Sequence, residues 1–159
     1  MLHRELRISP YTPLDEDELF SAYAVVVEAG GAFPRRPPAT RAMFRAAWLE
    51  RSTVVQVARV GGRLAGSYFI KPNFPDAAGH IANAGYLVVP ELRGRGIGRG
   101  LAEHSLTEAR RHGFDAMMFN LVLEANPSRH LWESLGFTVV GRIPEAIDGQ
   151  AAVIYWRAL

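Results

Sequence analysis

The sequence predicts a mixed α/β domain with about seven strands and about four helices. Strand-like and helical stretches follow one another in the order β-α-α-β-β-β-α-β-α-β-β. Two β-rich runs meet at Gly61-Gly62, which is the chemistry of a two-residue hairpin turn. No internal repeat or interdomain linker interrupts the 159 residues, so a single domain over residues 1–159 is expected.

The first elements are a short strand and a helix. Leu6–Ser9 is short and apolar enough for an edge strand. Thr12-Pro13-Leu14-Asp15 then supplies an N-cap, a proline at the first helical position and first-turn acids. The helix that starts there is expected to run to about Glu28 and to stop at Gly30-Gly31.

A loop, a second helix and a hairpin follow. The proline-rich segment 33–39 cannot be regular structure and is expected near the surface. Thr40 can cap a helix that reaches about Glu50. The runs Thr53–Val60 and Arg63–Lys71 form the two strands on either side of the diglycine turn.

The second half of the chain alternates strands and helices. A strand is expected over His80–Val89, ended by Pro90, and a helix then continues to Gly113, which sits where a C′ residue belongs. The next strand is Asp115–Val122. The remaining elements are a helix from about Pro127 to Leu135 and two strands, Phe137–Arg142 and Ala152–Arg157.

Composition is that of an ordinary globular protein. Hydrophobic residues make up 48% and charged residues 21%, which excludes a disordered or fibrous chain. The net charge of +2 is too small to indicate a nucleic-acid partner. Lys71 is the only lysine among the 18 lysine and arginine residues. With no cysteine there is no disulfide framework, thiolate nucleophile or zinc–thiolate site. No stretch resembles a signal peptide or a membrane helix, so a soluble cytoplasmic protein is expected.

The most informative stretch is "PELRGRGIGRGL", residues 90–101, which places four glycines and three arginines between a strand and a helix. The first turn of a helix has N–H groups without intrahelical partners and the positive end of the macrodipole. Glycine lets an anion approach the backbone closely. A phosphate group is therefore the expected ligand of this corner.

Spacing separates three phosphate motifs. A Walker loop needs Gly-Lys-Ser/Thr, and the only lysine lies elsewhere. A dinucleotide fingerprint needs glycines at relative positions 0, 2 and 5, and the required third glycine is replaced by Arg99 or by Leu101. The pattern that does match is Arg-x-x-Gly-x-Gly, as Arg93, Gly96 and Gly98.

This pattern resembles the acyl-CoA pyrophosphate loop of the GCN5-related N-acetyltransferase (GNAT) superfamily, and the element order is similar to that fold over nearly the whole chain. Leu131-Trp-Glu-Ser-Leu-Gly-Phe137 is similar to the family's Leu-Tyr-x-x-x-Gly-Phe on the last helix. Within the superfamily, three stretches resemble the yeast acetyltransferases that detoxify proline analogues such as azetidine-2-carboxylate. These stretches are Tyr68–Pro75, Asn83–Val88 and Phe119–Val122 with Glu124 and Asn126.

The resemblance implies a mostly antiparallel twisted sheet in which two parallel strands, His80–Val89 and Asp115–Val122, splay apart around acetyl-CoA. Gly85 inside the first of these strands fits a bulge or a close ligand approach. Acetyl-CoA is then the cosubstrate, and no metal is implied. The implied cofactor-binding residues are Leu87, Val88, Val89, Arg93, Gly94, Arg95, Gly96, Ile97, Gly98, Arg99, Asn126 and Trp132.

The implied reaction is direct attack of an amine on the thioester. A base is required because a free amine is mostly protonated at neutral pH, and Glu124, His130 or a water held by Asn83 and Asn120 would serve. Trp132 stands where the superfamily commonly has a tyrosine that protonates the departing thiolate, and indole cannot act as that acid. Because a thiol with a pKa near 8.5 is already a good leaving group, we expect Trp132 to be a packing wall beside CoA.

Three functions are weighed. The first is an acetyl-CoA-dependent N-acetyltransferase for a small amine or imino acid such as a proline analogue. The second is a noncatalytic acyl-CoA sensor with the same fold, which the missing tyrosine favours. The third is RNA binding through the Arg-Gly repeat, which lacks the aromatic interleaving or long disordered tract that such segments have. The resemblance leaves open a homodimer through the last strands, and Lys71 or Arg36 as the receiver of a substrate carboxylate.

Overall fold

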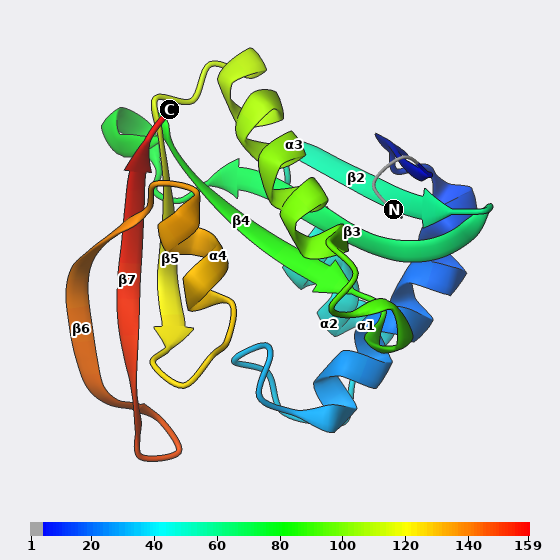
Figure 1. The fold of residues 1–159 in the computed structure, drawn as a ribbon, viewed down its shortest axis with the longest axis horizontal. Coiled ribbons are helices and arrows are strands. Elements are labelled where there is room, and N and C mark those ends of the chain that lie inside the picture. Colours follow the sequence, from blue (N-terminus) through cyan, green and yellow to red (C-terminus); the bar gives the residue numbers. More distant parts are fainter. Residues whose placement is uncertain (1–4) are drawn as a thin grey trace.

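The computed structural model describes residues 5–159 and forms one seven-stranded sheet in the order β1-β2-β3-β4-β5-β7-β6 (Figure 1). Its strands are β1 (Leu6–Pro10), β2 (Val54–Val60), β3 (Arg63–Pro72), β4 (Ile81–Val88), β5 (Ala116–Leu123), β6 (Thr138–Ile147) and β7 (Gln150–Ala158). Its helices are α1 (Glu16–Ala29), α2 (Arg41–Phe44), α3 (Ile97–Arg111) and α4 (Arg129–Ser134). The predicted element order and the mixed α/β fold are confirmed.

The helices cover the sheet on both faces and create two hydrophobic cores. One core joins α3 and α4 to the sheet through side chains such as Leu101, Met117 and Trp132. The other joins α1 and the α2 region to the opposite face and includes Tyr23 and Trp48. The sheet therefore separates the two cores, and any opening through it connects them.

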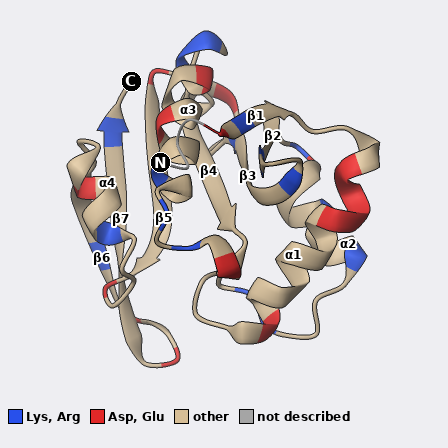
Figure 2. Ribbon diagram, turned by 45° about the vertical axis from the view of Figure 1, so that its right-hand side comes forward, with Lys and Arg blue, Asp and Glu red and all other residues tan. Residues whose placement is uncertain are grey.

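Local chemistry at the helix starts agrees with the sequence. Asp15 accepts a hydrogen bond from the backbone N–H of Thr12 at 2.8 Å, and the short 3-10 helix Pro13–Asp15 leads into α1. Thr40 accepts from the N–H of Met43, and α2 continues into a π-helical turn, Arg45–Leu49. Figure 2 shows acidic residues gathered at the first turn of α1, where they complement the helix dipole.

The two parallel strands separate almost as soon as they pair. β4 and β5 share register at only two positions, Ile81 with Ala116 and Ala82 with Met117. Beyond this fork β4 stays paired with β3, and β5 stays paired with β7. A bulge between Phe119 and Val122 bends β5 just past the fork. The expected splayed pair is confirmed.

The last hairpin is longer than the sequence indicated. β6 runs to Ile147 and β7 begins at Gln150, whereas the predicted strands ended at Arg142 and began at Ala152. Pro144 made this stretch look like a strand end. β6 is an edge strand, where a residue without an N–H is tolerated.

Gly85 lies opposite Phe69 in a part of β4 that has no bulge. β3 and β4 pair without a register shift there, so no bulge is present. A Cβ at Gly85 would lie 2.3 Å from the ring of Phe69, its cross-strand partner. The glycine makes room for an aromatic side chain of the protein. Of the two roles expected for it, the bulge was wrong and the close approach of a ligand stays a prediction.

Candidate active site

A cavity of about 1000 Å³ opens where β4 and β5 separate. Tyr86 and Trp132 line it from the α3–α4 face of the sheet, and Trp48 and Lys71 line it from the α1–α2 face. The cavity therefore passes through the sheet, and a ligand in it would touch both layers. A second cavity of about 560 Å³ shares many of its lining residues and continues it toward the β6–β7 turn.

Backbone groups of β4 point into this opening. Val89 donates its N–H to the carbonyl of Ala65, which shows that odd-numbered residues of this strand pair with β3. Because the direction alternates along an antiparallel strand, the N–H and C=O groups of Tyr86 and Val88 face the gap left by β5. The backbone of Val89, and by the same alternation that of Leu87, is therefore paired with β3 and does not face the gap.

The glycine-arginine loop, which is the stretch of residues 90–101 described above, lies at one end of the cavity. Gly94 and Gly96 have φ of +73° and +82°, a conformation that L side chains rarely adopt. Gly100 donates to the carbonyl of Gly96, so the N–H groups of the first turn of α3 precede the hydrogen-bonded ladder. At Gly98 a Cβ would meet nothing nearer than a Val88 methyl at 3.8 Å. Packing therefore does not require glycine at Gly98.

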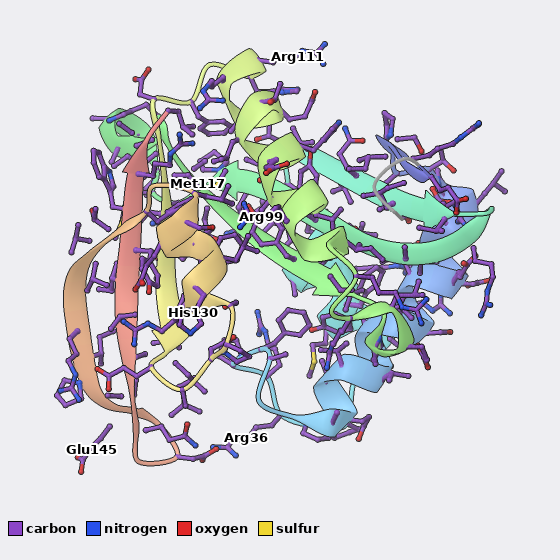
Figure 3. All side chains as sticks on the ribbon, in the orientation of Figure 1. Arg36, Arg99, Arg111, Met117, His130 and Glu145 are labelled. Atoms are coloured by element: carbon purple, nitrogen blue, oxygen red, sulfur yellow. The ribbon has the colours of Figure 1, made fainter. Side chains whose placement is uncertain are left out.

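The predicted cofactor residues divide into two groups. Those that line the cavity are Leu87, Val88, Arg93, Gly94, Ile97, Gly98, Asn126 and Trp132. Val89, Arg95, Gly96 and Arg99 do not belong to the lining. Arg99 lies beside α4, where it donates to Ser134 at 2.8 Å and pairs with Glu103 at 3.6 Å (Figure 3). Its guanidinium is thus occupied within the protein.

Two of the predicted site asparagines lie at the fork, and each makes its own hydrogen bonds. Asn83 donates from Nδ2 to the carbonyl of Met118 at 3.3 Å, which adds a side-chain rung where the backbone pairing ends. Asn120 forms two reciprocal amide hydrogen bonds with Asn73, at 2.7 and 2.8 Å. Asn83 and Asn120 both line the cavity. Asn73 lies in the stretch Tyr68–Pro75 that carries the narrower resemblance, but it was not singled out, because its role depends on this contact between distant segments.

Glu124 does not join the asparagines. Its carboxylate forms an ion pair with Arg142 of β6, and this hydrogen bond lowers the pKa of the carboxyl. Neither Glu124 nor His130 lines the cavity, and within residues 5–159 no acidic side chain or histidine does. Tyr86 lines it, but burial raises the pKa of its phenol, so it is a neutral hydroxyl at pH 7. Of the three expected sources of a base, the water held by the asparagines is the one that this geometry permits.

Trp132 is buried among aromatic rings. Its ring centroid lies 4.6 Å from that of Phe119 and 5.0 Å from that of Tyr86. Its indole N–H donates to the hydroxyl of Ser128 at 3.1 Å. Such packing gives the cavity a rigid wall on the α4 side, as a packing role requires.

The far end of the cavity is lined by residues from distant segments. Phe33 of the proline-rich loop and Phe69 line it, whereas Phe74 does not. Arg36, expected as a carboxylate receiver, instead pairs with Asp148 of the β6–β7 turn at 2.7 Å (Figure 3). Its neighbour Arg35, which sequence reasoning missed, lines the cavity.

Comparison with known proteins agrees with this geometry. The model of the acetyltransferase (GNAT) family matches residues 16–137. The chain belongs to the GNAT family. A GCN5-related N-acetyltransferase from Kribbella flavida has a similar structure, with a TM-score of 0.92, 31% identity and 99% coverage of both chains.

Two other proteins are similar over different spans. The N-acetyltransferase aca1 of Schizosaccharomyces pombe is 49% identical over 84 residues, which are 52% of this chain and 40% of that protein. The yncA structure from Salmonella typhimurium, solved with its cofactor acetyl-CoA, has a TM-score of 0.83 at 22% identity and covers 98% of this chain and 94% of its own. The chain thus spans less than half the length of its fission-yeast relative.

None of the helices in residues 5–159 has both the length and the apolar character needed to cross a bilayer. In the same part of the chain, no three His, Cys, Asp or Glu side chains lie close enough together to bind a metal ion.

Proposed function

We propose that this GNAT protein is an acetyl-CoA-dependent N-acetyltransferase that acts on a small amine or imino acid, such as a proline analogue. The observation that carries the proposal is the cavity at the β4–β5 fork, which connects a glycine-rich anion site to a pair of asparagines. Named relatives add support, because aca1 is an N-acetyltransferase and yncA was solved with acetyl-CoA.

The donor end has features that fit the pyrophosphate of CoA. Arg93 and the first N–H groups of α3 supply charge and hydrogen-bond donors, and Gly98 leaves space for the phosphates. From there the pantetheine arm would follow the free backbone groups of Tyr86 and Val88. Asn126 accepts from the N–H of Ser128 through Oδ1, which leaves its Nδ2 to donate to the pantetheine amides.

The reaction uses direct attack. The amine nitrogen forms a bond to the acetyl carbon, the carbon–sulfur bond breaks, and CoA leaves as a thiol. A backbone N–H of Tyr86 or Val88 is in place to stabilise the developing oxyanion, a contribution worth about 10²–10³ in rate.

The proton of the acceptor leaves through water. With Nδ2 of Asn83 donating to Met118, its Oδ1 is left to accept from the amine or from such a water. Asn120, held by Asn73, would orient the acceptor from the other strand. Arg142 holds the ionised Glu124 away from the cavity, so Glu124 is not the base in this proposal.

The test measures thiol release from acetyl-CoA with a panel of proline analogues, amino acids, polyamines and protein N-termini. Release with a small amine or imino acid, together with an N-acetylated product detected by mass spectrometry, is the expected result. Tight CoA binding without thiol release from any acceptor would overturn the proposal.

The second candidate is a noncatalytic acyl-CoA sensor. Trp132 favours it, since its ring lacks a hydroxyl and its N–H is already donated to Ser128. In that case the cavity would bind acetyl-CoA and the chain would transmit its occupancy to a partner. The same assay separates the two, because a sensor binds acetyl-CoA and releases no thiol. A cytoplasmic location, a single domain and a homodimer stay predictions.

A further inference from the structure

The charged residues that line the larger cavity are all positive, and Asp148, which lines the smaller one, is paired with Arg36. The charged lining residues of the larger cavity in the described part of the chain are Arg35, Lys71 and Arg93, with no carboxylate among them. None of the three takes part in an ion pair between described residues. A cavity of this kind attracts anions and disfavours cations.

The three cations lie at two separate ends. Arg93 belongs to the glycine-arginine loop after β4, whereas Lys71 pairs in register with Asn83 near the start of that strand. At a strand rise of about 3.3 Å per residue, the five residues from Asn83 to Val88 span roughly 17 Å. The phosphates of CoA would bind to Arg93 and to the N-terminus of α3. Lys71 is then available to bind a different anion.

Lys71 is held over the cavity wall. Its ammonium lies 5.1 Å from the ring centroid of Phe69, a cation–π contact that keeps the side chain against the sheet. Burial, with the charges of Arg35 and Arg51, lowers its pKa. An anion bound between Lys71 and Arg35 would offset this repulsion.

Contacts made by Phe33 and Arg36, which lie before and after Arg35 in the chain, hold the loop that bears Arg35. Phe33, two residues earlier, stacks on Tyr23 with ring centroids 5.7 Å apart. Arg36, the next residue, is paired with Asp148 of the β6–β7 turn. These contacts hold the loop so that Arg35 reaches the same end of the cavity as Lys71.

We infer that Lys71 and Arg35 form a carboxylate anchor that makes an amino or imino acid the acceptor and excludes neutral and cationic amines. The inference rests on the proposed function and narrows its substrate class. Bound in this way, the acceptor directs its nitrogen toward Asn83, the cross-strand partner of Lys71, and thus toward the fork. Lys71 acts here as a cation and not as the base.

The test compares matched acceptors that differ only in the carboxylate, namely L-proline with L-prolinamide and glycine with glycinamide. The amide has the less basic amine and so more free base at neutral pH. A preference for the acid therefore cannot come from amine protonation. We expect the acids to be preferred by about 100-fold in kcat/KM, because the amides lose charge-assisted hydrogen bonds. Putrescine should be inactive, because it is a dication that would face a positively charged lining.

Substitutions test which residues cause the preference for the acid over the amide. Lys71→Met and Arg35→Met should each lower kcat/KM for the acid by about 10- to 100-fold and change the amide by less than about threefold. Lys71→Arg should retain the preference, since arginine keeps the charge but cannot act as a base. Arg51→Gln is the matched control, because Arg51 lies near Lys71 without lining the cavity. Melting temperature and acetyl-CoA affinity establish that each variant is folded.

Three results would overturn the anchor: equal use of acid and amide by the wild type, a loss in Lys71→Arg as large as in Lys71→Met, or an equal loss in Arg51→Gln. If a variant does not fold, inhibition of the wild type by cyclopentanecarboxylate but not by cyclopentanecarboxamide supports the anchor, and equal inhibition contradicts it. Absence of thiol release with every acceptor contradicts the proposed function instead, and binding of cyclopentanecarboxylate to the acetyl-CoA complex then tests the anchor separately.

Discussion

The two ends of the cavity are built in different ways. The donor end comes largely from one continuous stretch, from the last residues of β4 to the first turn of α3. The acceptor end is assembled from the proline-rich loop, β3, β4, β5 and β7. A function that depends on backbone geometry can be encoded locally, whereas a pocket made of side chains depends on how distant segments meet. The donor end is thus encoded by neighbouring residues, and the acceptor end by the meeting of segments far apart in the sequence.

The largest effect is expected at the donor end. Arg93→Glu should weaken CoA binding by about 100-fold, because a charge-assisted contact to phosphate becomes a repulsion. Arg95→Glu changes the net charge equally, but Arg95 does not line the cavity, and its effect should stay below about threefold. Isothermal titration of both variants with CoA measures the difference. Equal losses would mean that a diffuse field, and not a built site, attracts the phosphates.

At the acceptor end, Asn83→Ala should lower kcat/KM for the acceptor by about 10- to 100-fold through loss of a hydrogen-bond acceptor at the fork. CoA affinity should change by less than about threefold, since the glycine-arginine loop is left intact. Steady-state kinetics and titration with CoA are run on the same preparation. A matching drop in CoA affinity would show that the two ends are not independent, and that the contact of Asn83 with Met118 holds the fork itself.

The strand, the glycine turn and the helix start of the donor end were predictable because their signals are local. Glycine favours the positive φ of Gly94 and Gly96, and the anion site that these residue types indicate stays a prediction. The matching pattern singled out Arg93, but Arg95 and Arg99 were expected at the cofactor as well. Which arginine faces the ligand depends on the packing of α3 against α4, which gives Arg99 a partner in Ser134.

The acceptor end was less predictable because it depends on strand register. Nothing in the sequence states that Lys71 lies opposite Asn83, or that Asn73 meets Asn120 across the fork. Glu124 follows the splayed strand directly and so was expected at the site. Arg142 of β6 pairs with Glu124 even though β7 lies between β5 and β6. The strand with which an edge strand pairs cannot be predicted from a local sequence pattern.

A smaller effect concerns pH and distinguishes the acceptor end from the donor end. Burial, Arg35 and Arg51 favour the neutral form of Lys71 and lower its pKa. As pH rises through that pKa the ammonium loses its charge, so the inhibition constant of cyclopentanecarboxylate should increase by up to about tenfold per pH unit. In Lys71→Arg the increase should vanish, because arginine stays charged. A rise of equal size in both proteins would assign the pH dependence to another group.

The smallest effect is expected at Trp132, which lies between the two ends. Trp132→Phe removes the indole N–H donated to Ser128 but keeps an aromatic ring against Tyr86 and Phe119. If CoA departs without help from an acid, kcat at saturating acetyl-CoA should fall by less than about tenfold, short of the 10²–10⁴ typical of a lost general acid. Trp132→Tyr is the informative counterpart, because it supplies the phenol that the family commonly has at this position. A much larger loss in the phenylalanine variant, rescued by tyrosine, would mean that the indole and Ser128 together assist the departing thiolate, and that the wall between donor and acceptor takes part in the chemistry.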